Sequence, residues 1–226
     1  YPANDDFLKR HHDTNALHYW ANWCLCNIAA KMAIGIVTDR RDIYNEGIDH
    51  LQTGDTNGRL RRAIYHDYAP DYNFAQWQES GRDQGHTLMC VGLMGVICQL
   101  AWSQGDDFFA YDDNLFMRAC EYAACCNYTN ETVPYTTYIW QKQSQWGYPI
   151  PEEQTTLGGG KWIKRAIWAL PYYHYKGIKN ISNDNLKYTK IATEYVGIEG
   201  GGGYYDANSG GYDVLGPVSY THLTLP

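Results

Sequence analysis

A dense group of chemically active side chains lies in the stretch WQESGRDQGHT, Trp77 to Thr87, directly before a long apolar run. Its charged and polar members are Glu79, Arg82, Asp83, Gln84 and His86. Polar groups at this density are costly to place beside a core unless they pair with one another or face a cleft. Carboxylate, guanidinium, amide and imidazole groups together could bind an anion and transfer a proton. The stretch is therefore the first candidate for a functional site.

Composition limits what such a site could act on. The chain has 226 residues, 44% of them apolar and 19% charged, which is typical of a globular protein. Its formal net charge of −7 argues against nucleic acid as a partner, because nucleic-acid binding usually needs a basic surface. The chain also has 21 Tyr and 8 Trp, more than a core of this size needs. Aromatic rings with a polar edge suit sugar binding, although they can also simply fill a helical core.

Several familiar motifs are excluded by their spacing. The run Gly158 to Lys161 is not a phosphate-binding loop, because Trp162 follows the lysine. The 7 cysteines include no CxxC pair, and most lie in apolar runs as small buried residues. His11, His12 and His18 lie near one end of the chain, where a solvated cluster is more common than a metal site. No HExxH or GxSxG motif occurs, and we expect no metal, nucleotide or redox cofactor.

Apolar residues at helical spacing predict an all-α protein. The expected helices are Ala16 to Val37, Asp42 to Leu51, His86 to Trp102, Asn114 to Cys126, Lys161 to Tyr175 and Asp184 to Val196. Pro171 is expected to kink or divide the fifth of them. The helix from His86 to Trp102 is apolar on two faces, so it should lie between layers and be almost fully buried. Alternating polar and apolar runs are nearly absent, which argues against a sheet.

The two ends of the chain differ from the rest. Tyr1 is not a start residue, so we expect the chain to begin inside a domain. The segment Val218 to Pro226 departs from the preceding pattern and resembles translated adapter sequence. We therefore expect one partial domain at 1–217 and a non-native or unstructured tail at 218–226. Sequons at Asn127, Asn130 and Asn180 support secretion weakly. No signal peptide or membrane span is visible, and we expect a secreted or periplasmic protein that does not bind membranes.

A set of segments that includes the WQESGRDQGHT stretch resembles the alginate lyase domain superfamily. The segments are HYWANW, WQESGRDQGHTLM, YDDNLFMRACEYAA, VPYTTYIW, IWALPYYHY and EGGGGYYDANSGGYDVLG, which lie between Asp5 and Gly216. ESGRDQGHT followed by VPYTTY is fairly specific as a combination, whereas Asn22-Trp23-Cys24 departs from the Asn-Trp-Asp that relatives tend to have. The resemblance implies an (α/α) toroid of paired helices, truncated at its N-terminus. It also implies a lyase that cleaves an acidic polysaccharide of the alginate or glucuronan type.

The resemblance also implies roles for particular residues. In a uronate lyase a base removes the C5 proton, an acid protonates the departing C4 oxygen, and donors neutralise the C6 carboxylate. Gln84 and His86 would recognise the carboxylate with help from Asn22, and Tyr135 or Tyr138 would be base or acid, with a nearby cation lowering its pKa. His86 could instead be the base, with a tyrosine as the acid. Gln84 and His86 can face one cleft only if the helix begins at about this point.

Other residues are expected to bind the substrate or to support the site. The set is Trp77, Glu79, Arg82, Arg165, His174 and Tyr175. Arg82 and Asp83 could instead be an ion pair at the helix start, and Glu79 could orient the imidazole of His86. The last two residues of the set could pack beneath the cleft instead of lining it.

Two other functions stay open. A glycoside hydrolase would need carboxylates on opposite sides of the bond, such as Glu79 and Asp106, whereas Glu79 and Asp83 lie one helical turn apart. A non-catalytic carbohydrate-binding protein would use the aromatic rings alone. The products separate the three functions, because only a lyase leaves a conjugated double bond. The sequence leaves the preferred uronate, endo or exo action and the oligomeric state open.

Overall fold

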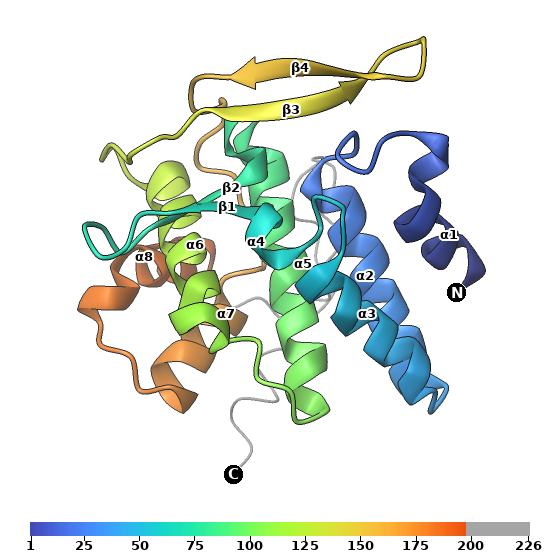
Figure 1. Ribbon diagram of the computed structural model, residues 1–226. Helices are drawn as coiled ribbons and strands as arrows, with labels where there is room; N and C mark the ends of the chain where they lie inside the picture. The colour runs from blue at the N-terminus through green and yellow to red at the C-terminus, as the bar shows by residue number, and fades with distance from the viewer. Residues whose placement is uncertain (198–226) are drawn as a thin grey trace.

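The computed structural model describes residues 1–197, and both the expected tail at 218–226 and the segment EGGGGYYDANSGGYDVLG lie outside this range. The α-helices are α1 (Pro2–Arg10), α2 (Ala21–Val37), α3 (Arg41–Thr53), α4 (Leu60–Ala63), α5 (Gln84–Ser103), α6 (Tyr111–Tyr128), α7 (Ala169–Tyr173) and α8 (Lys187–Val196). The strands are β1 (Ile64–Asp67), β2 (Ala75–Trp77), β3 (Tyr138–Gln143) and β4 (Pro149–Gln154). Short helical turns are η1 (His11–Asp13), η2 (Gln78–Gly81), η3 (His174–Ile178, of the π type) and η4 (Asp184–Leu186). Figure 1 shows their arrangement.

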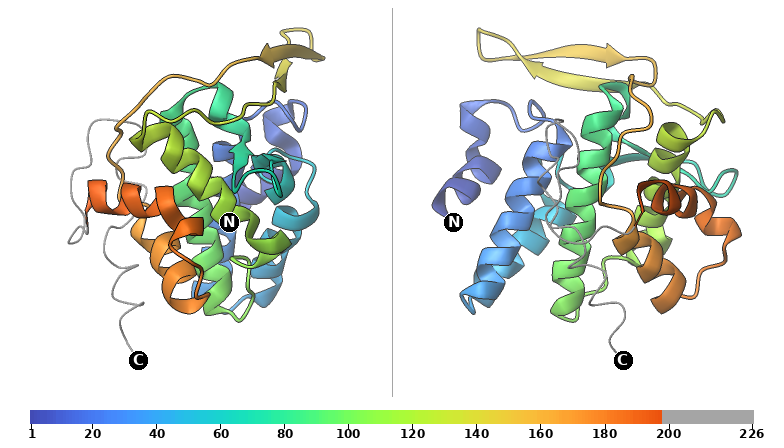
Figure 2. Two further views of the ribbon diagram at one scale, coloured as in Figure 1. Left: turned by 90° about the vertical axis from the view of Figure 1, so that its left-hand side faces the viewer. Right: turned by 180° about the vertical axis from the view of Figure 1, so that it is seen from behind.

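Helix α5 is the centre of the molecule. It packs against α2 on one side and α6 on the other (Figure 2). Leu88, Met94 and Ile97 are fully buried between these neighbours, as predicted, whereas Leu93 and Val96 of the other apolar face are only partly buried, so the helix is less buried than expected. By length and composition it could also cross a membrane, but the core helix of a soluble protein has the same properties and more than half of α5 is buried.

A close helical hairpin of α2 and α3 covers one side of α5. A Cβ added at Gly35 would lie 2.5 Å from the backbone nitrogen of Tyr44, so only glycine permits this approach of the two backbones. Lys31 of α2 is buried, and its Nζ lies 2.5 Å from a carboxylate oxygen of Asp5 and 2.5 Å from one of Glu46. These two ion pairs join α1, α2 and α3 through one cation.

The expectation of an all-α toroid is wrong, because the described residues combine eight α-helices with two small antiparallel sheets. Strand β1 pairs with β2, and β3 pairs with β4 from Tyr138↔Gln154 to Gln143↔Pro149. The strands have between three and six residues, too few to give a convincing alternating pattern in the sequence. Pairing across a hairpin provides the regularity that the single strands lack.

Three predicted helices begin later than expected, and one of them, expected from Asp184, becomes α-helical only at Lys187 after η4. The helix expected from Ala16 begins at Ala21, and the one expected from Lys161 has α-helical hydrogen bonds only from Ala169 to Tyr173 before η3 continues it. Pro171 is the third residue of α7, where the backbone N–H that proline lacks would have no intrahelical acceptor. Proline therefore lies in the first turn of this helix and does not kink a longer one.

The β3–β4 hairpin is fixed to the loop between α1 and α2. Trp140 donates its indole N–H to the carbonyl oxygen of His18 at 2.7 Å, and the backbone N–H of Gln143 donates to His18 Nδ1 at 2.8 Å. Asn15 donates from its side chain to the carbonyl oxygen of Gln141 at 3.1 Å. Figure 1 shows that the hairpin consequently lies across the end of the molecule where α2 and α5 begin.

Candidate functional site

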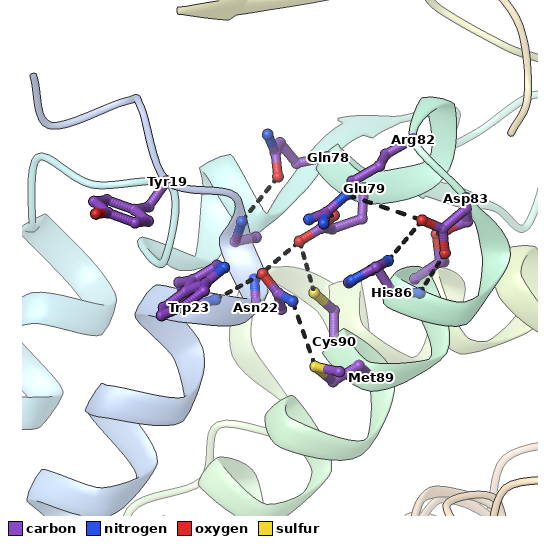
Figure 3. Close-up of polar contacts among 12 residues, drawn as sticks. Tyr19, Asn22, Trp23, Gln78, Glu79, Arg82, Asp83, His86, Met89 and Cys90 are labelled. Atoms are coloured by element: carbon purple, nitrogen blue, oxygen red, sulfur yellow. Dashed lines mark hydrogen bonds and ion pairs between the residues drawn. The ribbon is translucent and has the colours of Figure 1, made fainter. Parts of the chain in front are cut away.

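The N-terminal ends of α2 and α5 meet at η2, the short turn that contains Glu79. The first two backbone N–H groups of α2 donate to side chains of η2, Ala21 to Gln78 Oε1 at 3.0 Å and Asn22 to Glu79 Oε1 at 3.1 Å (Figure 3). These N–H groups have no acceptor within their own helix, so η2 satisfies them. Two segments more than fifty residues apart are thereby held together at the start of α5.

Glu79 is the buried acid of this junction. Its side chain is fully buried, and its Oε2 lies 3.3 Å from Nη1 of Arg82. Burial raises the pKa of Glu79 to about 7, although Arg82 and the N–H of Asn22 act to lower it. Burial therefore favours the protonated form of this carboxyl group more than in an exposed glutamate.

Asp83 and His86 form a hydrogen-bonded pair in the first turn of α5. One carboxylate oxygen of Asp83 accepts the backbone N–H of His86 at 2.8 Å, which caps the helix, and the other lies 2.6 Å from Nδ1 of the imidazole. Burial alone would raise the pKa of Asp83, but the hydrogen bonds from His86 outweigh it and lower this pKa. The carboxylate of Asp83 holds Nδ1 of His86, which leaves Nε2 for another partner. The side chain of His86 is 24% exposed.

Arg82 connects the two carboxylates. Its guanidinium pairs with Glu79, its Nε lies 3.9 Å from Asp83 Oδ2, and it lies over the ring of Trp20 at 5.3 Å. The side chain is 29% exposed, so part of the cation remains open to an anion. The only ion pair that the sequence suggested for Arg82 was with Asp83, but Arg82 also contacts Glu79 and Trp20.

Asn22 is buried, and its amide donor has only a weak acceptor. Its Oδ1 accepts the backbone N–H of Trp23 at 2.8 Å, while its Nδ2 donates to the thioether sulfur of Met89 at 3.4 Å. Thioether sulfur is a poor acceptor. A carboxylate or hydroxyl oxygen brought to this position would be a better partner for the amide.

Gln84 faces away from His86. It is buried, its Oε1 accepts the side-chain N–H of Asn127 at 3.1 Å, and its Nε2 points to the carbonyl oxygens of Ser80 and Gly158 at 3.4 Å. The helix does begin where the sequence predicted, with Asp83 as its N-cap. However, residues two apart in a helix point about 200° apart, and Gln84 is already the first helical residue. Figure 3 shows Asn22, Arg82 and His86 around Glu79, whereas Gln84 is bonded elsewhere.

The two candidate tyrosines lie on and beside β3. Tyr138 is 7% exposed and donates its hydroxyl to Asn57 Oδ1 at 3.3 Å, whereas Tyr135 donates to the carbonyl oxygen of Gln154 at 2.8 Å. Burial raises the pKa of each to about 12. This direction is opposite to the lowering by a cation that the sequence suggested. Both hydroxyls remain protonated at neutral pH and can act as donors.

The other predicted site residues lie in the protein interior. Trp77 is fully buried and donates its indole N–H to the carbonyl oxygen of Ala119 at 2.9 Å. Tyr175 donates its hydroxyl to the carbonyl oxygen of Phe109 at 2.9 Å, and His174 stacks on the Phe109 ring with a centroid distance of 3.5 Å. Arg165 is also buried. Of the two arrangements expected for His174 and Tyr175, the structure has the one in which they pack in the core.

Glu79 and Asp106 are separated by the whole length of α5. Glu79 precedes the helix and Asp106 follows it, and 20 residues of α-helix extend over about 30 Å. Asp106 accepts the hydroxyl of Tyr44 at 2.7 Å and lies 3.3 Å from Arg41. This carboxylate pair is too far apart for glycoside hydrolysis. Within residues 1–197 there is also no group of three or more His, Cys, Asp or Glu side chains that could hold a metal ion.

The contact between Asp83 and His86 could have been predicted from the sequence. Asp83 and His86 are three residues apart at a helix start, the spacing at which an N-cap side chain reaches the third helical residue. Gln78 and Trp20 had no such local signal, because each reaches its partner across the fold. Comparison of the chain with protein-family models, curated proteins and solved structures finds no match.

Proposed function

We propose that this protein is a polysaccharide lyase that cleaves a uronate-containing polysaccharide of the alginate or glucuronan type by β-elimination. The observation that carries the proposal is the Asp83–His86 pair, with its 2.6 Å contact at Nδ1 and a partly exposed imidazole. It lies beside a partly exposed cation, Arg82, and a weakly bonded amide, Asn22. A base beside two donors for an anion is the arrangement that this elimination requires. Such a protein would meet its polymer outside the cytoplasm, as a secreted or periplasmic enzyme.

The first requirement of the reaction is to stabilise charge on the C6 carboxylate. The C5 proton of a uronate is weakly acidic, and it becomes easier to remove when donors bind the carboxylate as charge develops. Arg82 offers a guanidinium that is 29% exposed, and Asn22 offers the Nδ2 that now points to Met89. A charged donor and an amide donor together would hold the carboxylate and orient the sugar ring.

The second requirement is the transfer of two protons. In the proposed reaction Nε2 of His86 takes the C5 proton, the C4–C5 double bond forms, and the C4–O bond breaks. Asp83 at Nδ1 would hold the imidazole in position and stabilise the imidazolium that results. Tyr138, with a pKa of about 12 because of burial, is the proposed donor of a proton to the departing C4 oxygen. Proton exchange with water restores both groups.

Of the two schemes that the sequence left open, the one with histidine as base is favoured. A tyrosine base would need a lowered pKa, and burial raises the pKa of both Tyr135 and Tyr138 to about 12. Tyr138 is also preferred to Tyr135 as the acid, because the hydroxyl of Tyr135 already donates to the Gln154 carbonyl at 2.8 Å, whereas that of Tyr138 makes a longer bond of 3.3 Å.

The product of the reaction tests the proposal. The purified protein is incubated with alginate, glucuronan and pectate, and ultraviolet absorbance and new reducing ends are measured together. We expect both signals to rise together on one of these polymers. Reducing ends without absorbance would identify a hydrolase, and binding without either signal would identify a carbohydrate-binding protein. Either of these outcomes contradicts the proposal.

A matched pair of variants tests the role of the acid. Tyr138→Phe removes the proposed donor, so turnover should fall by about 10²-fold or more. Tyr135→Phe is the control, because it removes a hydroxyl of similar pKa that is bonded to a carbonyl oxygen. Equal losses in both variants, with unchanged melting temperatures, would show that neither hydroxyl has the proposed specific role.

A further inference from the structure

Trp23 is an exposed aromatic ring in the first turn of α2, directly beside Asn22. Its side chain is 47% exposed although it is large and apolar. The ring stacks on Phe7 with a centroid distance of 6.2 Å and an interplanar angle of 26°, and it contacts Tyr19 at 5.4 Å. Two neighbouring rings therefore contact Trp23 while nearly half of the residue stays exposed to solvent.

Polar groups lie on the residues next to Trp23. The hydroxyl of Tyr19 lies 3.0 Å from Nδ1 of His12, and the amide of Asn27 donates to the carbonyl oxygen of Trp23 at 2.8 Å. A sugar ring has an apolar face of C–H groups and an edge of hydroxyls, so an aromatic face with polar neighbours matches both parts. A ring that its neighbours already hold also loses little conformational freedom when a ligand binds.

The position of this ring relative to the proposed site indicates what it binds. Asn22 accepts the backbone N–H of Trp23 at 2.8 Å, so the amide of the site and the ring share one turn of helix. Figure 3 shows Tyr19 and Trp23 on one side of Asn22, and Arg82 and His86 on the other. A polymer whose reacting uronate lies between Asn22 and His86 would continue over Trp23.

We propose that Trp23 and Tyr19 form a stacking subsite for a further sugar residue of the polysaccharide, next to the residue that reacts. The inference rests on the proposed function for the identity of the polymer. The subsite makes binding depend on chain length, because a short oligosaccharide that does not reach Trp23 gains nothing from it. Trp23 is thus a binding residue and takes no part in the transfer of protons.

Three variants test the subsite in the whole protein. Trp23→Ala removes the exposed ring, Trp23→Phe keeps a smaller ring, and Trp102→Ala is the control. Trp102 is a partly exposed tryptophan, 37% accessible, in the last turn of α5 at the opposite end of that helix. KM and kcat are measured on the polymer and on oligosaccharides of increasing length, and binding is measured by calorimetry. Melting temperatures confirm that each variant is folded.

We expect Trp23→Ala to raise KM for the polymer by about tenfold, equal to roughly 1.4 kcal/mol, with little change in kcat. The smallest substrate that is cleaved should be unaffected, Trp23→Phe should be intermediate, and Trp102→Ala should match the wild type. Equal affinity of folded Trp23→Ala and wild-type protein for the polymer would overturn the subsite. If the wild type binds a polymer without cleaving it, the lyase proposal fails, but the calorimetric comparison still decides the subsite. A wild-type protein that binds none of the polymers would overturn both proposals.

Discussion

The two ends of α5 carry similar residues in different surroundings. At its N-terminal end are His86 and Asp83, with the cation of Arg82 nearby. Beyond its C-terminal end are His174, which stacks on Phe109, and the ion pair of Lys179 with Asp107. Each end thus has an imidazole near a carboxylate and a cation. Residue types alone would make both ends equal candidates for acid–base chemistry.

The two histidines differ in anchoring and in exposure. His86 has a carboxylate oxygen 2.6 Å from Nδ1 and is 24% exposed. His174 is fully buried, and neither ring nitrogen has a hydrogen-bond partner among the described residues. Burial lowers the pKa of His174 to about 4, so it is neutral at physiological pH. A histidine can serve as a base when one nitrogen is held and the other is accessible, and only His86 of these two meets that condition.

Of the substitutions that distinguish the two ends of α5, we expect the loss of His86 to change turnover most. His86→Ala should reduce elimination by roughly 10²- to 10⁴-fold, the usual contribution of a general base. The carboxylate of Asp83 would remain as the helix cap, because it accepts a backbone N–H. Turnover is measured by ultraviolet absorbance and folding by the melting temperature. A folded His86→Ala protein with near-normal turnover would remove His86 from the proposed mechanism.

Replacing the partner of His86 tests the anchoring itself. Asp83→Asn keeps an oxygen that can cap α5 but removes the charge that stabilises a protonated imidazole, so turnover should fall by about 10²-fold. Stability should change little, since Asn and Asp are similar N-caps. Comparing kcat with the melting temperature separates the two roles. A loss of stability without a loss of kcat would mean that Asp83 acts only as a cap.

At the opposite end of α5, we expect His174 to change how the stability of the fold depends on pH and to leave catalysis unchanged. Its pKa is lowered from 6.5 to about 4, so the fold favours the neutral ring. This stability is complete above pH ~6.5 and is lost as the pH falls towards 4, by about 3 kcal/mol in all. His174→Phe should flatten the dependence of the free energy of unfolding on pH in this window, measured by denaturant titration.

Turnover of His174→Phe at neutral pH should equal that of the wild type. His174→Leu is a second variant in case phenylalanine is too large beside Phe109, whose ring centroid is 3.5 Å from that of His174. An unchanged pH dependence in a folded variant would show that other groups control acid unfolding.

The smallest effect is expected at a third histidine, His18, which holds the hairpin. Its Nδ1 accepts the backbone N–H of Gln143, and a protonated ring cannot accept this bond. Burial, and then the charge of Lys142, lower the pKa of His18. Stability from the neutral ring is therefore present above its unfolded pKa of about 6.5 and is lost at lower pH.

Hydrogen exchange of the Gln143 amide measures this effect. In the wild type its protection should fall between pH 7 and pH 5 by about fivefold more than the intrinsic pH dependence requires, equal to a hydrogen bond of about 1 kcal/mol. His18→Asn is the matched variant, because its Oδ1 can accept the same bond without titrating in this range. Identical pH profiles for the two proteins would contradict the role of His18.

Local chemistry determined the start of α5 and its place in the fold. The apolar run after His86 has two apolar faces, so the sequence alone predicted a central, buried helix. Asp83 is a preferred N-cap residue three positions before His86, and the structure uses it in that way. These features depend on residues within a few turns of one another, which is why they can be predicted without the fold.

Tertiary structure decided which of the candidate residues meet. Gln84 points towards Asn127, and His174 is buried against Phe109, although both are candidate site residues by residue type and position. The β3–β4 hairpin, which contains Tyr138, is held by a bond between His18 and Gln143, 125 positions apart. Burial and hydrogen bonding of this kind depend on groups that only folding brings together. The order of residues alone could therefore list the reactive side chains but could not select among them.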